Sequence, residues 1–376
     1  MGDRRLSSET ETTVETDVDI ATEGASLPVN PSIVFRRVEL LLGQELSVPE
    51  IRVLRLEPAN RTHALSTDNF SRRMGIVRRQ SMNEVGGNTH RGVVRIFYTQ
   101  AATSSKIEQV LAHEFVHVSQ PQRLRKQLAA EQGPHSETTD ARIVREAIVE
   151  GSAVYVANRY TERYLPNVTK QATYPEWESF SAGTKWHLSP YYVGEEYVRN
   201  RIDSADATTS IYAAPPVTTE QLLHGKSPAT EPPTNLSVNS NVTESMWEVE
   251  QTDVKGELFV RIVLAEQLSA SRASAAASGW GNDRVVTFRA ENRTLHAWTL
   301  KWDDEQNATE FENAVRAYLD RRAIERDGVR TDGTFRVDLR RVDATTVTLL
   351  LGNSSVETTS VTVNGPNVSI RPGAVP

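Results

Sequence analysis

Apolar and polar positions in the first part of the chain follow two periods, and each period predicts its own kind of element. Apolar residues recur at three- and four-residue steps over 107–118 and 140–164, as they do on amphipathic helices. A shorter helix is expected over 32–43, where a glycine ends the pattern. Segments 51–56 and 92–100 are expected to be strands. Strands that lead into long helices are typical of α+β domains.

After residue 226 the pattern breaks into shorter runs. Segment 227–244 is rich in Pro, Asn, Ser and Thr, which predicts a linker or a long surface loop. Helical patterns follow at 256–276 and 308–323. Short apolar runs predict strands at 285–289, at 295–301 and in the stretches FRVDLRRV, TTVTLLLG and SVTVNG. This part of the chain is expected to be α+β with an antiparallel sheet.

These patterns divide the chain into a tail, two domains and a linker. Residues 1–28 are acidic and rich in Thr and Ser, with almost no apolar positions, so we expect a disordered tail. Residues 29–226 are expected to form a mostly helical domain with a small edge sheet. The linker at 227–244 then leads to a smaller accessory domain at 245–376. A chain of 376 residues is long enough for two such domains.

Composition and charge exclude several classes of protein. A formal net charge of −7 argues against a nucleic-acid partner, which usually requires a basic surface. No apolar run is long enough for a transmembrane segment, and the N-terminus lacks the apolar core of a signal peptide. The chain has no cysteine, so any metal must be held by histidine and carboxylate. Arginine outnumbers lysine 35 to 7, a bias typical of GC-rich or halophilic genomes and of an archaeal-like composition.

The strongest chemical signal is HEFVH, in which His113, Glu114 and His117 form an HExxH pattern. Residues four apart lie on one face of a helix, so both imidazoles can reach one metal ion. Glu114 would lie beside a water bound to that ion, as a general base does. This geometry predicts a hydrolase with one Zn²⁺. Catalytic zinc normally takes three protein ligands, so a carboxylate must come from elsewhere in the chain.

HEFVH at 113–117 and VEGSAVY at 149–155 together resemble the gluzincin metallopeptidases, and in particular the peptidase-MA-like group. In that family a Glu on a following helix is the third zinc ligand, and the match implies Glu150 in that role. The resemblance implies a zincin-like fold for the first domain. Weaker similarity at 190–194 and 218–224 extends it over about residues 90 to 226.

One departure from the family pattern leaves a second candidate for the third ligand. Thermolysin-like members carry an acidic residue four positions after the ligand, where it orients a histidine. Four positions after Glu150 is Val154, whereas four positions after Glu146 is Glu150 itself. Glu146 as the ligand, with Glu150 supporting a histidine, is therefore the alternative.

The resemblance implies hydrolysis of a peptide or protein substrate. Zinc would polarise the scissile carbonyl and acidify a water, while Glu114 would take the water's proton and pass it to the leaving amine. A donor to the oxyanion is also required. The candidates are Tyr191, Tyr192 and His224, and Tyr155 is less favoured because it lies on the ligand helix.

Two other functions are compatible with the same residues. One is a surface binding protein that keeps the zincin fold without turnover, and the other is a zinc hydrolase of non-peptide substrates. Nine of the 18 asparagines lie in N-x-S/T sequons, more than chance would give, which predicts an extracellular or cell-surface glycoprotein. The candidates for glycosylation are Asn60, Asn69, Asn167, Asn235, Asn241, Asn292, Asn307, Asn353 and Asn367.

Overall fold

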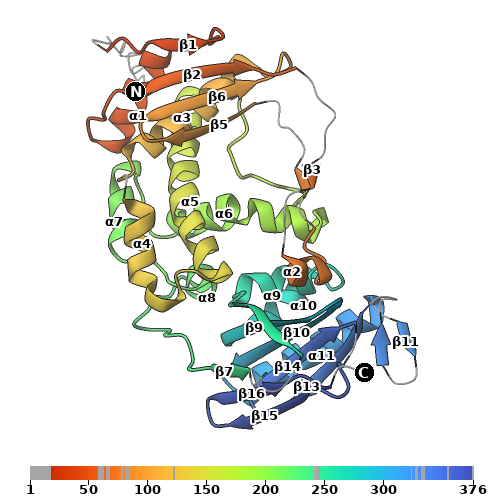
Figure 1. Cartoon of the computed structure of the whole chain (residues 1–376). Coiled ribbons are helices and arrows are strands. Elements are labelled where there is room, and N and C mark those ends of the chain that lie inside the picture. The colour runs from red at the N-terminus through yellow and green to blue at the C-terminus, as the bar shows by residue number, and fades with distance from the viewer. Residues whose placement is uncertain are drawn as a thin grey trace, which may run out of the picture.

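The computed structural model of the chain has a small sheet at one end, a larger sheet at the other and helices between them (Figure 1). It describes residues 18–57, 63–64, 68–77, 79–80, 85–121, 123–240, 242, 246–322, 324–326, 329–331, 335–353 and 355–374. No helix within these ranges combines the length and the apolar character needed to cross a membrane. The chain is of the α+β class, as expected.

The small sheet has four strands in the order β1-β2-β6-β5 (Figure 1). These are β1 (Thr22–Gly24), β2 (Glu50–Arg55), β6 (Val93–Tyr98) and β5 (Val85–His90). The first three are parallel, whereas β5 pairs antiparallel with β6 and forms an edge. The strands expected at 51–56 and 92–100 are β2 and β6. A separate pair consists of β3 (His63–Ala64) and β4 (Arg79–Gln80).

The expected disordered tail is wrong over its last residues. Residues 1–17 lie outside the described part of the chain, but β1 adds to the sheet beside β2. Ile20 is buried in the core, and its N–H donates to Ser32 Oγ at 3.1 Å. Segment 18–28 therefore belongs to the folded protein, because a long-range strand pairing orders residues that have little apolar character of their own.

Eight α-helices of the described chain precede residue 226. They are α1 (Pro31–Leu42), α2 (Asn69–Arg73), α3 (Ser104–Ser119), α4 (Leu124–Gln132), α5 (Thr139–Tyr164), α6 (Ala182–Arg199), α7 (Thr208–Ala213) and α8 (Thr219–His224). The side chain of Asn30 caps the start of α1, and Gly43 ends it with a φ of 63°. The helices expected at 32–43, 107–118 and 140–164 are thereby confirmed as α1, α3 and α5.

The central helix of this region is α5, which packs against α3 and α6 (Figure 1). Its backbone comes very close to that of α6 where Gly151 faces Gly194. A Cβ atom at Gly151 would lie 2.2 Å from the carbonyl carbon of Gly194, and a Cβ at Gly194 would lie 2.2 Å from the carbonyl oxygen of Ala147. Only hydrogen side chains fit at these two positions, so backbone contact determines how close the two helices lie.

The larger sheet has seven strands in the order β11-β12-β13-β14-β10-β9-β8, and every neighbouring pair is antiparallel, as expected. They are β8 (Glu248–Asp253), β9 (Trp280–Ala290), β10 (Arg293–Trp302), β11 (Ile324–Arg326), β12 (Val329–Thr331), β13 (Arg336–Arg341) and β14 (Thr346–Gly352). Its helices are α9 (Glu257–Leu264), α10 (Ala270–Ala277) and α11 (Glu305–Arg322). The single helix expected at 256–276 is therefore two helices, because Ser269 caps a new start.

The segment expected as a linker is partly structured. Within it, β7 (Ser237–Ser240) pairs parallel with β16 (Asn367–Arg371), which in turn pairs with β15 (Ser360–Asn364). Leu236 is buried in a small hydrophobic core beneath this sheet. The second part of the chain thus begins near residue 236, because the partner of β7 lies more than a hundred residues further along the chain.

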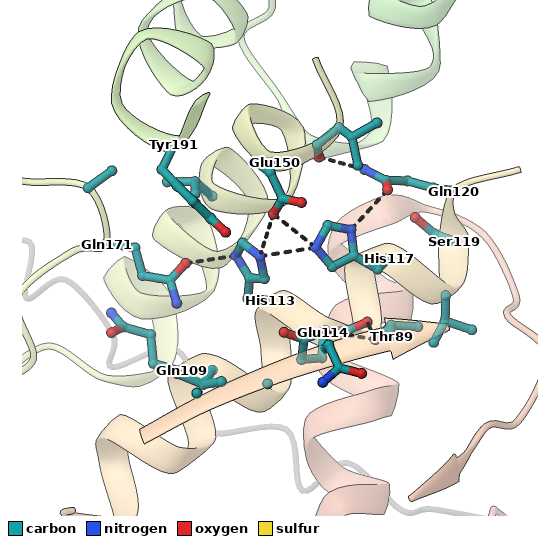
Figure 2. Close-up of a pocket in the computed structure, with 18 of the residues that line it drawn as sticks. Thr89, Gln109, His113, Glu114, His117, Ser119, Gln120, Glu150, Gln171 and Tyr191 are labelled. Atoms are coloured by element: carbon teal, nitrogen blue, oxygen red, sulfur yellow. Dashed lines mark hydrogen bonds and ion pairs between the residues drawn. The ribbon is translucent and has the colours of Figure 1, made fainter. Parts of the chain in front are cut away.

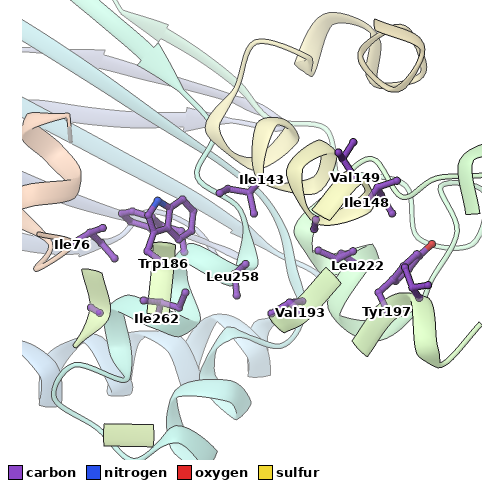
Figure 3. Close-up of a cluster of buried hydrophobic side chains, with 14 of the residues drawn as sticks. Ile76, Ile143, Ile148, Val149, Trp186, Val193, Tyr197, Leu222, Leu258 and Ile262 are labelled. Atoms are coloured by element: carbon purple, nitrogen blue, oxygen red, sulfur yellow. The ribbon is translucent and has the colours of Figure 1, made fainter. Parts of the chain in front are cut away.

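The two parts of the chain share a continuous hydrophobic core where they meet. Phe259 of α9 makes edge contacts with Trp186 of α6 and with Trp298 of β10, at ring centroid distances of 5.5 and 5.7 Å. Phe70 of α2 stacks on the same phenylalanine. Figure 3 shows Trp186 beside Ile262, with apolar side chains from both parts around them. The accessory part is therefore an integral component of the fold.

We expect Gly151→Ala to destabilise the protein by about 3 kcal/mol or more, because the added methyl group meets the backbone of α6, which cannot rotate away. The measurement is urea-induced unfolding followed by circular dichroism. Glu196→Ala, at an exposed position of α6, is the matched control and should change the free energy of unfolding by no more than about 0.5 kcal/mol. Equal urea midpoints for Gly151→Ala and the wild type would contradict this packing.

Candidate metal centre

The HExxH segment lies on the middle and last turns of α3, which the fold holds firmly. Thr103 caps the helix start by accepting a hydrogen bond from the N–H of Lys106. Phe115 is fully buried and makes an edge contact with Phe35 of α1, with the ring centroids 5.1 Å apart. With this face against the core, the opposite face directs His113 and His117 toward α5 (Figure 2).

Three side chains converge at one point between α3 and α5 (Figure 2). The Nε2 atoms of His113 and His117 lie 3.1 Å apart, and Glu150 Oε2 lies 3.4 Å and 3.3 Å from them. A tetrahedral zinc ion about 2.0 to 2.1 Å from each ligand keeps ligand atoms about 3.3 to 3.4 Å apart. Two imidazole nitrogens and one carboxylate oxygen also match the donor types of a catalytic zinc. The residues present therefore fit this ion.

The geometry distinguishes the two candidates for the third ligand. Glu150, on the turn of α5 that faces the histidines, is the carboxylate in the cluster. Glu146, one turn earlier, pairs with Arg142 at 3.0 Å. The alternative assignment of Glu146 is therefore not favoured, because its carboxylate is engaged on the surface of α5.

A second layer of polar groups orients the ligands. Gln171 Oε1 lies 2.9 Å from His113 Nδ1, and Gln120 Oε1 lies 2.9 Å from His117 Nδ1. An acceptor at Nδ1 places the proton there and leaves Nε2 free to bind a metal. The free oxygen of Glu150 lies 3.4 Å from the guanidinium of Arg125. The sequence analysis missed all three. Only Gln120 carried a signal, as a polar residue three positions after His117.

Glu114 points away from the ligand cluster toward the edge strand β5 (Figure 2). Thr89 Oγ1 lies 2.8 Å from Glu114 Oε2 and 3.0 Å from the backbone carbonyl oxygen of Glu114, so its one proton is shared between these two acceptors. A Cβ atom at Gly87 would lie 2.6 Å from Glu114 Cγ. Glycine in β5 therefore allows the strand to pass directly over the proposed general base.

The cluster lies in the wall of a cavity of about 1680 Å³. The cavity is bounded by β5 and α3, by α5 and α6, and by the loop 169–176. Both His113 and Glu114 are more than nine-tenths buried, yet they line this open space. A substrate much larger than a single amino acid can therefore reach the three ligands.

The charges of His117 and Glu150 depend strongly on each other. Burial opposes protonation of His117, but the Glu150 carboxylate outweighs it and raises the pKa of His117 to about 9. Burial acts against the charged form of Glu150 too, and the two imidazoles hold the pKa of this carboxyl well below its usual range. Before a metal binds, the cluster thus pairs one carboxylate with a positive charge. A divalent cation can take the place of that charge.

Of the candidate oxyanion donors, only Tyr191 lines the cavity. Its ring centroid lies 6.4 Å from that of His113, and its hydroxyl points toward the ligands (Figure 2). Burial, together with the charges of Glu150 and Glu114, raises the pKa of Tyr191, so the hydroxyl keeps its proton at neutral pH.

The other three candidates lie elsewhere. Tyr192, the neighbour of Tyr191, stacks on Trp177 with ring centroids 4.4 Å apart. His224 pairs with Glu257 at 2.9 Å, and Tyr155 donates to the carbonyl of Ile202. These contacts turn all three side chains away from the ligands and correct the expectation for Tyr192 and His224.

Most of the described sequon asparagines are accessible. Asn69, Asn167, Asn235, Asn292, Asn353 and Asn367 are exposed, whereas Asn307 is half-buried within α11. The amide of Asn307 also lies against Gly279, which leaves little room for a sugar there. Asn60 and Asn241 lie outside the described residues.

Comparison with known families identifies only the second part of the chain. Residues 244–371 match a family described as a domain of unknown function (DUF8575). The match begins near β8, ends at the last residue of β16 and includes none of the residues at the metal centre. No curated protein and no solved structure matches the chain.

We expect Glu150→Ala to lose zinc and Glu146→Ala to keep it, because only Glu150 Oε2 lies within 3.4 Å of both imidazole nitrogens. The measurement is metal content by inductively coupled plasma mass spectrometry after dialysis against zinc-free buffer. The wild-type protein should hold one zinc per chain. Zinc lost from Glu146→Ala and retained by Glu150→Ala would reverse the assignment.

Proposed function

We propose that the protein is a zinc-dependent metallopeptidase with a zincin-like catalytic region of the gluzincin type. The observation that carries the proposal is the triangle of His113, His117 and Glu150 atoms, with sides of 3.1 to 3.4 Å, in the wall of an open cavity. These residues would hold one Zn²⁺. When bound there, zinc polarises a carbonyl group and increases the acidity of a water molecule.

Glu114 is the proposed general base. It directly follows His113 on α3 and lines the cavity. Among the described residues, its carboxylate accepts a side-chain hydrogen bond only from Thr89. Its other oxygen is available to take a proton from the attacking water. The same proton then passes to the amine nitrogen as the peptide C–N bond breaks. The hydrogen bond from Thr89 holds the carboxylate against β5, in the lining of the cavity.

Tyr191 is the proposed donor to the developing oxyanion. Its hydroxyl faces the ligands from α6, on the opposite side of the histidines from Glu114 (Figure 2). Since its pKa is raised, the group stays protonated and can donate a hydrogen bond throughout the neutral range. This position is available because Pro190 and Ser189 are buried and hold the preceding turn of α6 against the core.

A peptide is favoured over a small substrate by the size of the cavity and by the strand beside it. The cavity of about 1680 Å³ exceeds the roughly 300–1,000 Å³ of typical small-molecule sites. The edge strand β5, from Val85 to His90, forms part of its lining. We further propose that the protein acts outside the cell, since six of the described sequon asparagines are exposed, as glycosylation requires.

We expect Glu114→Gln to lower kcat for peptide hydrolysis by about 10²–10⁴-fold while zinc content stays at one per chain, because the amide cannot accept the water's proton. The assay compares a library of quenched fluorescent peptides with matched esters and small amides. Wild-type turnover of esters alone would replace the peptidase proposal by a non-peptide hydrolase. No turnover of any substrate by the zinc-loaded wild type would favour a binding protein.

We expect Tyr191→Phe to lower kcat by about 10²-fold with little change in KM, because the hydroxyl contributes mainly in the transition state. Tyr192→Phe is the matched control, since the neighbouring ring stacks on Trp177 away from the ligands. It should keep wild-type kinetics. Equal effects of the two substitutions would show that Tyr191 has no specific role.

A further inference from the structure

A second group of possible metal ligands lies far from the histidines, where the two parts of the chain meet. Carboxylate oxygens of Glu220, Glu231 and Asp303 lie within 4.8 Å of one another. Glu220 belongs to α8, Glu231 follows that helix in the next loop, and Asp303 directly follows β10. Figure 1 shows α8 beside α9 at the junction of the two parts. The three acids thus come from three segments that converge only in the folded chain.

Glu220 is the unusual member, because it is buried without a partner. Its side chain is 4% exposed, and within the described part of the chain it makes no hydrogen bond or ion pair. Nearby Glu257 shows the usual arrangement for a buried carboxylate, since Arg261 at 3.0 Å and His224 at 2.9 Å neutralise it. Without a cation, Glu220 is accommodated here as the neutral acid, and a bound cation would allow all three carboxyl groups to ionise.

The raised pKa values of the acids are consistent with a cluster that a cation would stabilise. Burial, together with the charges of Glu257, Asp303 and Glu231, raises the pKa of Glu220 to about 9. Asp303 shows a raised pKa for the same reasons, burial first and then Glu231. Lys226 lies 3.5 Å from Glu231, but its ammonium is half exposed and is shared with the solvent.

The backbone around Asp303 holds this residue in place and leaves one side of its carboxylate open. The N–H of Asp303 donates to the carbonyl of Gly279 at 2.9 Å, which ties the acid to the start of β9. A Cβ atom at Gly281 would lie 3.2 Å from Asp303 Oδ1 and 2.4 Å from Thr234 Oγ1. Glycine at 281 therefore keeps this side of the carboxylate open.

We propose that Glu220, Glu231 and Asp303 form a calcium site, separate from the histidine centre. All three donors are hard oxygen ligands, which calcium prefers, and no imidazole is present to favour zinc. Three oxygens within 4.8 Å of one another can contact a single calcium ion at about 2.3 to 2.6 Å each. Calcium also tolerates an irregular set of ligands from separate segments, whereas magnesium demands near-ideal octahedral geometry.

Calcium at this position would join the two parts of the chain. The residue before Glu220 is Thr219, whose N–H and hydroxyl both donate to Asp140 Oδ1, at 3.0 and 2.5 Å. Asp140 lies in the first turn of α5, the helix that carries Glu150. The ion would therefore stabilise the contact that holds the start of α5, without touching the substrate cavity.

Isothermal titration of the full-length, EGTA-treated protein with calcium chloride tests the proposal. We expect one site per chain with a Kd between about 10⁻⁵ and 10⁻³ M. Glu220→Gln should weaken binding by at least about 100-fold, since loss of a direct ligand exceeds the effect of losing a supporting group. The glutamine resembles the protonated acid in shape, so the variant should fold. Exposed Asp303→Asn is a second variant that should weaken binding too.

Glu248→Gln, at an exposed position of β8, is the matched control for the change in charge and should bind calcium like the wild type. His113→Ala should also keep calcium binding, because it removes only the zinc centre. Calcium should raise the melting temperature of the wild type and leave that of Glu220→Gln unchanged. Unchanged calcium affinity in Glu220→Gln, absence of a binding heat in the wild type, or tighter binding of magnesium than of calcium would overturn the proposal.

Discussion

The distance between α3 and α5 is the constraint on which the metal centre depends, since one helix supplies two imidazoles and the other the carboxylate. On the far side of α5, Gly151 and Gly194 place the helix in backbone contact with α6. On the near side, Gln109 donates to Thr161 and Tyr160 donates to Glu108, at 2.9 and 2.6 Å. A slip of one residue along α5 would move Glu150 by about 1.5 Å and turn it by about 100°. The ligand triangle would then be lost.

The second part of the chain contributes to the same constraint, although it supplies no ligand. The first turn of α5 donates backbone hydrogen bonds to it, from Thr139 to Asp253 and from Asp140 to the carbonyl of Val254, at 2.8 and 3.0 Å. Lys255, buried beside these residues, pairs with Asp253 and reaches Asp68 near α2. A polar network and a shared aromatic core therefore act together at the junction. This explains why the region matching DUF8575 packs closely against the first part of the chain.

Much of the local structure could be predicted because its signals lie close together in the sequence. The glycine after α1, the apolar periods of α3 and α5 and the alternation in β2 each depend on neighbours within a few residues. The predictions that were wrong concern elements whose partners lie far away in the sequence. β1 and β7 look like tail and linker because their own composition is polar, and they are strands only because β2 and β16 pair with them. The apolar junction between the two parts could not be predicted for the same reason, since Trp186 and Phe259 meet only in the folded chain.

At the site, the sequence by itself determined that His113 and His117 share a helix face with Glu114 between them, because four residues make about one turn of any α-helix. The tertiary structure decided which carboxylate joins them, since both Glu146 and Glu150 satisfy the same period and only helix packing places one near the imidazoles. It also decided that Tyr191 faces the cavity while Tyr192 does not, because adjacent residues on a helix point about 100° apart. The supporting glutamines and the partnerless Glu220 depend on contacts between segments that no local pattern records.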